Sequence, residues 1–178
     1  MIKPFCGSEH KKFRNQFLFS EIGSFLNQPR PPSVIRRGRP MPKNFPFYKQ
    51  HDAMDCGAAC LRMVARHHGR YYSLEFLRNL THQRKEGVSL LEISDAAEHI
   101  GLRTLAAKIS FERLLNDVPL PCIAHWRQDH YVVVYAVSAK FVWVADPAIG
   151  NMKLTKEEFL EGWESVHEDG ENRGVVMV

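Results

Sequence analysis

Residues 50–63 have the sequence QHDAMDCGAACLRM, and the prediction of the fold starts from them. The small residues from Cys56 to Cys60 predict the first turn of a helix that runs from Asp55 to about His68 and stops at Gly69. Unsatisfied backbone N–H groups at a helix N-terminus carry partial positive charge, which favours a thiolate over a thiol. Cys56 is therefore a candidate nucleophile.

Two later runs, residues 130–137 and 141–145, are rich in β-branched and aromatic residues. A short turn separates them, so they predict an antiparallel hairpin. If its centre is Ser138, His130 and Asp146 lie directly opposite each other, with Cβ atoms about 4.5–5.5 Å apart. At that distance a carboxylate accepts a hydrogen bond from an imidazole. A one-residue slip of the turn would weaken the inference, because side chains would change face.

Four residues then make a candidate hydrolytic site for acyl transfer. His130 takes the proton from Cys56, or shares an ion pair with it, and later protonates the leaving amine. Asp146 orients the imidazole ring and stabilises its cation. Gln50 supplies a side-chain N–H, beside the backbone N–H of Cys56, to the oxyanion of the tetrahedral intermediate. The chain order Gln, Cys, His, Asp is that of papain-like enzymes, although the signature around the cysteine of papain itself is absent.

Two motifs resemble those of a known family, the double-glycine-leader cysteine peptidase domains of peptidase-containing ABC transporters that export bacteriocins and peptide pheromones. The first motif is Gln50, five intervening residues, the segment 56–60 and then Met63. The second is His130-Tyr131-Val132-Val133 followed by Asp146-Pro147. Their occurrence together and in order is far more specific than either motif alone.

The resemblance covers residues 45–163 and implies a papain-like cysteine peptidase fold. It also implies cleavage after a Gly-Gly pair that ends a leader peptide, coupled to export. The implied partners are a precursor peptide with an amphipathic leader helix and the transmembrane and ATPase parts of an ABC exporter. A related non-catalytic version of this domain lacks the nucleophilic cysteine, whereas this chain keeps Cys56.

The rest of the chain predicts an α+β scaffold in which early helices pack on an antiparallel sheet. A second helix begins near Ser73, and a third follows the capping box at residues 89–92 and ends at Gly101. Further strands are expected at residues 102–109 and 122–126. A second capping box, Thr155-Lys156-Glu157-Glu158, opens a helix through Trp163. The nucleophile is then on the helical side, the His and Asp on the sheet side, and the site in the cleft between them.

Taken singly, each candidate also has an ordinary structural interpretation: a buried cysteine, a sheet histidine, a turn aspartate and a solvated glutamine. Cys60, one helical turn after Cys56, raises a zinc alternative with His67 and His68. Four ligands at zinc-like spacings are not found, so we expect no metal and no cofactor. Cys60 and Cys122 are predicted to be core residues.

The first 43 residues differ in composition from the remainder. They hold nine lysines and arginines against two glutamates, while residues 44–178 hold fifteen against eighteen acidic residues. Six of the ten prolines also lie there. We predict a basic, proline-rich, partly disordered extension at 1–43, with a short helix around residues 18–26, and a peptidase domain at 44–178. The basic run at 36–39 is a weak nucleic-acid signal, and no nucleic-acid partner is expected.

No apolar run is long enough to span a membrane, and residues 1–30 lack the apolar block of a secretory signal. We therefore expect a cytoplasmic protein, or one at the cytoplasmic face of the bacterial inner membrane. Four cysteines without a disulfide pattern fit a reducing compartment. Two other functions remain open: a catalytically idle leader-binding module, and a cysteine hydrolase for another amide. The chain is either an excised domain or a stand-alone peptidase.

Overall fold

The structure, a computed structural model, describes residues 44–81, 87–168 and 171–178. The predicted first helix is present as α2, Cys56–His67, and follows a single 3-10 turn, η1, Ala53–Asp55. The small residues of α2 form its buried face, because eight of its twelve residues are buried. Gly69 has a φ of 78° just after the helix, the left-handed conformation that glycine adopts without strain. The predicted boundaries of this helix are confirmed.

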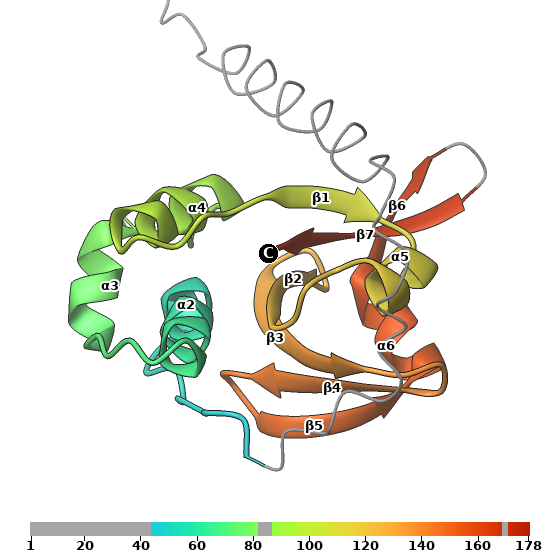
Figure 1. Cartoon of the computed structure of the whole chain (residues 1–178), viewed down its shortest axis with the longest axis horizontal. Coiled ribbons are helices and arrows are strands. Elements are labelled where there is room, and N and C mark those ends of the chain that lie inside the picture. Colours follow the sequence, from blue (N-terminus) through green and yellow to red (C-terminus); the bar gives the residue numbers. More distant parts are fainter. Residues whose placement is uncertain (1–43, 82–86, 169–170) are drawn as a thin grey trace, which may run out of the picture. The chain divides into compact units, whose positions relative to one another are not determined.

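Two more helices pack against α2, namely α3, Leu74–Leu80, and α4, Leu90–His99. The hydroxyl of Ser73 caps α3, and Ser89 with Glu92 forms the predicted capping box of α4. Gly57 is needed where α2 meets α4, because a Cβ there would lie 2.5 Å from Val88 Cγ1. These three helices form one layer of the domain (Figure 1).

The sheet is antiparallel, with the strand order β1-β7-β2-β3-β4-β5, and β6 pairs with β7 off this path. Its strands are β1, Ala106–Ile109; β2, Cys122–Trp126; β3, His130–Val137; β4, Phe141–Asp146; β5, Gly150–Thr155; β6, Glu164–Glu168; and β7, Glu171–Met177. The strand expected at 102–109 is present only in its second half. β5, β6 and β7 were not predicted.

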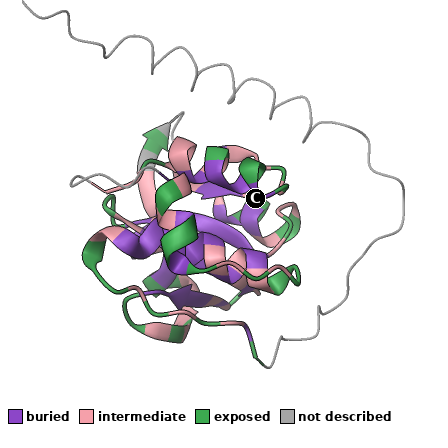
Figure 2. Cartoon of the chain, turned by 90° about the vertical axis from the view of Figure 1, so that its left-hand side faces the viewer, coloured by how far each residue is buried: buried purple, intermediate pink, exposed green. Residues whose placement is uncertain are grey.

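Helices lie on both sides of the sheet. Ile123, Tyr131, Val133 and Ala145 join the buried cluster formed with α2, α3 and α4. On the other side are α5, Phe111–Asn116, and α6, Lys156–Trp163, the helix predicted from its capping box. Phe159 of α6 lies against Trp126 of β2, with ring centroids 5.6 Å apart. Figure 2 shows the buried residues concentrated in the strands and the inward sides of the helices.

The predicted register of the β3–β4 hairpin is wrong by two residues near the site. The structure pairs Val133 with Ala145 and Val134 with Val144, and a bulge follows before Ala136. Continuing this register places Asp146 opposite Val132, so His130 is its diagonal neighbour. Next to the turn, Val137 pairs with Val142, so the turn lies further along the chain than predicted and the register there differs by three residues. The bulge, which adds a residue to one strand, reduces the difference to two. Because the shift is an even number, both side chains stay on one face and within reach.

The predictions for residues 1–43 lie outside the described residues. Within the described ranges, no helix has both the length and the apolar character required to cross a bilayer.

Candidate active site

The candidate nucleophile is the first residue of α2 and is 5% exposed. One turn further on, the thiol of Cys60 donates a hydrogen bond to the carbonyl of Tyr131 at 3.2 Å. This contact joins α2 to β3, the strand that carries His130. The helix start is therefore held against the sheet at the point where the site residues meet.

His130 is the first residue of β3 and follows a tight turn from β2. Arg127 and Gln128 in that turn have φ values of 48° and 68°, and Trp126 pairs with His130 across it. The imidazole Nε2–H donates to Asp146 Oδ1 at 2.8 Å. The Cys56 thiol also acts on the ring, because hydrogen bonding to the thiol and its charge help to raise the pKa of His130. The imidazole thus links the cysteine to the carboxylate, as a nucleophile, base and orienting acid require.

The environment favours a charged His130. Burial alone would lower its pKa, but the hydrogen bonds to Asp146 and Cys56, with their charges, raise that pKa to about 9. Burial would raise the pKa of Asp146, yet the hydrogen bonds from His130 and the backbone N–H of Ala148 keep this pKa below its ordinary value. The pair is therefore arranged to hold an imidazolium beside a carboxylate.

Gln50 lies beside this pair because its backbone N–H donates to the carbonyl of Pro147, 2.9 Å away, just after Asp146. Its side-chain oxygen Oε1 is buried and has no hydrogen-bond partner among the described residues. A buried acceptor without a partner among the described residues requires one from water or a ligand. The structure therefore brings Gln50, Cys56, His130 and Asp146 to one end of α2.

Two other cysteines and a tyrosine considered from the sequence lie in the protein core. Cys60 and Cys122 are buried, and burial raises the pKa of both thiols. Tyr131 of the second motif is also buried. No group of three or more metal-ligating side chains occurs in the parts of the chain that the structure describes.

One group near the site was not singled out from the sequence. Asp55, directly before Cys56, is fully buried and forms an ion pair with Arg78 of α3. The only signal in the sequence is an acidic residue next to the nucleophile, and nothing in the chain order connects it with an arginine 23 positions later.

A cysteine at the start of a helix, beside a histidine that donates a hydrogen bond to an aspartate in the adjacent antiparallel sheet, defines the papain-like cysteine peptidases as the class. The model of the Peptidase C39 family matches residues 44–167, more than half of the chain. The chain belongs to this family of cysteine peptidases.

Curated relatives include the lactococcin-G-processing and transport ATP-binding protein LagD of Lactococcus lactis, 38% identical over 122 residues. The transport/processing ATP-binding protein ComA of Streptococcus pneumoniae is 38% identical over 128 residues. These alignments cover 66% and 67% of this chain but only 17% and 18% of the relatives. The chain therefore spans less than a fifth of their length.

Two solved structures have the same fold. One is a double glycine motif protease from an AMS/PCAT transporter in complex with the leader peptide, with a TM-score of 0.67 and 29% identity over 75% of this chain and 89% of that one. The other is the peptidase domain of Streptococcus ComA, with a TM-score of 0.64 and 31% identity over 76% and 97%. The predicted α+β, papain-like fold is confirmed.

Proposed function

We propose that this chain cleaves the leader peptide of a bacteriocin or peptide-pheromone precursor after a Gly-Gly pair, in association with an ABC exporter. The observation that carries the proposal is the His130–Asp146 hydrogen bond beside Cys56, the first residue of α2, in a Peptidase C39 domain. The processing functions in the names of LagD and ComA support it. So does the complex of a similar double-glycine protease with a leader peptide.

The four site residues have separate roles in this proposal. Cys56 attacks the carbonyl carbon of the second glycine and forms a thioester with it, while His130 gives its proton to the leaving amine of the next residue. Asp146 keeps the imidazole oriented and charged. The Gln50 side chain and the backbone N–H of Cys56 stabilise the oxyanion. Water then hydrolyses the thioester with His130 as the base, so no metal or cofactor takes part.

Burial of the nucleophile supports a substrate with small residues at the scissile bond. Cys56 is 5% exposed and the His130 side chain 17% exposed, so little surface at the reacting atoms is open. Two glycines present only backbone and can approach a recessed thiol where larger side chains would collide. A leader helix would bind elsewhere on the domain through its apolar face.

Association with an exporter places the domain at the cytoplasmic face of a bacterial inner membrane in this proposal. The basis is the description of relatives such as LagD and ComA as transport and processing proteins. A nucleic-acid partner forms no part of the proposal.

The test is cleavage of a synthetic leader peptide that ends in Gly-Gly and continues for a few cargo residues, followed by mass spectrometry. Wild type should cut after the second glycine, whereas Cys56→Ala and His130→Ala should not, although both should keep the circular dichroism spectrum of wild type. Full activity of Cys56→Ala would refute the proposal. Binding without cleavage would favour an idle leader-binding module. A reactive thiol without peptide binding would favour another amide substrate.

A further inference from the structure

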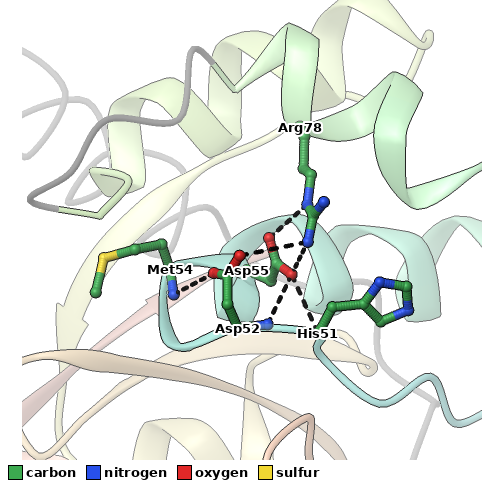
Figure 3. A network of polar contacts seen from close by, with 5 residues as sticks. All are labelled: His51, Asp52, Met54, Asp55 and Arg78. Atoms are coloured by element: carbon green, nitrogen blue, oxygen red, sulfur yellow. Dashed lines mark hydrogen bonds and ion pairs between the residues drawn. The ribbon is translucent and has the colours of Figure 1, made fainter.

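The Asp55 carboxylate is at the centre of a buried polar network one residue before the nucleophile (Figure 3). Its side chain is 0% exposed. Oδ2 accepts hydrogen bonds from the backbone N–H groups of His51 and Asp52, each at 3.1 Å. The Arg78 guanidinium donates from Nε to Oδ1 and from Nη2 to Oδ2. A single carboxylate therefore ties the loop before α2 to a different helix, α3.

This loop carries both predicted oxyanion donors, because Gln50 is at its start and Cys56 at its end. The start is fixed by the hydrogen bond from Gln50 N–H to the Pro147 carbonyl at 2.9 Å. The middle is fixed by Asp52, whose side chain accepts the N–H of Met54 at 2.9 Å. The end of the loop is fixed by the Asp55 side chain, which is bonded to Arg78 of α3. Two donors stabilise an oxyanion only when both are about 2.7–3.1 Å from the same point, so loop geometry matters for the rate.

The positive charge of Arg78 compensates the negative charge of the Asp55 carboxylate. A buried carboxylate beside a reacting thiolate would oppose it unless a cation were in contact. The guanidinium provides that cation and two parallel donors, a geometry that lysine cannot reproduce. A second carboxylate, Asp52 Oδ2, lies 3.6 Å from the same guanidinium.

We propose that Asp55 and Arg78 are positioning residues: they hold the 50–56 loop so that the Gln50 amide and the Cys56 N–H converge on one oxyanion site. This inference rests on the proposed acyl-transfer role of Cys56. Neither residue touches the substrate, and both act through the loop.

The experiment compares two reactions of the same thiol in the full chain. Acylation of Cys56 by p-nitrophenyl acetate passes through a tetrahedral oxyanion, whereas alkylation by iodoacetamide does not. In Asp55→Asn and Arg78→Lys, acylation should fall about 10- to 100-fold, the range for misplaced or lost oxyanion donors. Alkylation should stay within about threefold, because the thiol and His130 are unchanged. Cys56→Ala gives the background rate for both reagents.

Matched controls remove the same charges at exposed helical positions. Asp95→Asn on α4 and Arg113→Gln on α5 should leave the ratio of acylation to alkylation as in wild type. Thermal unfolding is recorded for every variant. If Asp55→Asn does not fold, Arg78→Lys carries the test, because it keeps the cation and leaves the carboxylate in place.

An unchanged ratio in both variants would overturn the inference, as would equal losses in both reactions, which would indicate a structural role only. The outcome is independent of leader recognition. If wild type leaves the Gly-Gly peptide intact while the ratio falls in the variants, the proposed function fails and the positioning role stands.

Discussion

Replacing Asp146 with Asn should move the alkaline limit of peptidase activity to lower pH. Hydrogen bonds to Asp146 and Cys56 outweigh burial and raise the pKa of His130 from 6.5 to about 9. At about 1.36 kcal/mol per pH unit, this rise corresponds to roughly 3 kcal/mol in favour of the imidazolium. A carboxylate in contact contributes about 1–3 units to such a rise, so Asp146 supplies a large part of it.

The direction of the pH shift depends on which protonation state of His130 is active. In the proposed mechanism the imidazolium protonates the leaving amine, so activity should persist below a pH of about 9 and fall as the pH rises through that value. In Asp146→Asn the pKa of His130 should drop by about 1–2 units. At pH 8 the protonated fraction then falls from about 90% to between about 10% and 50%. Loss of ring orientation lowers the rate further.

The assay is kcat/KM for the leader peptide between about pH 6 and pH 10, with NMR titration of the His130 ring as a direct check. Asp129→Asn is the matched control, because Asp129 is exposed, adjacent to His130 in the chain and not among the groups that raise its pKa. If the alkaline limb of the kcat/KM profile does not move in Asp146→Asn, the carboxylate does not set the pKa of His130. An equal shift of the alkaline limb in Asp129→Asn would also contradict a specific role of Asp146.

Three further substitutions test the site and its scaffold. Gln50→Ala should lower leader cleavage about 10²- to 10³-fold and leave iodoacetamide alkylation near wild type; parallel losses would contradict an oxyanion role. Gly57→Ala should lower the free energy of unfolding by about 1–3 kcal/mol in urea titrations, because its Cβ would lie 2.5 Å from Val88 Cγ1. Ser89→Ala should cost about 1 kcal/mol in the same assay through loss of the α4 cap. If either Gly57→Ala or Ser89→Ala has the free energy of unfolding of wild type, the role given to that residue is wrong.

Local sequence patterns were enough to predict the helices α2, α3, α4 and α6 and three of the strands, but not α5. The capping boxes at Ser89 and Thr155 act over three residues, and so they identify helix starts without knowledge of the rest of the fold. The strand β7 was missed because it pairs with β1 and β2, which are far away in the chain. Strand placement of that kind depends on long-range pairing, which local propensity does not encode.

The contact between His130 and Asp146 was predicted from a register that proved wrong. It is nevertheless present, because the two-residue error preserved the face of the sheet on which both side chains lie. The turn lies further along the chain than predicted, and the bulge next to Val134, which makes the difference an even number, has no clear mark in the sequence.

The candidate reactive groups can be identified without the structure: a cysteine at a helix start, with a glutamine, a histidine and an aspartate at spacings similar to those of a peptidase family. How these groups are held in place depends on the packing of the whole domain. The bond from Gln50 to the Pro147 carbonyl and the ion pair of Asp55 with Arg78 both join segments from different parts of the chain. Such contacts form only when helices and sheet pack together, because burial makes each polar group require a partner.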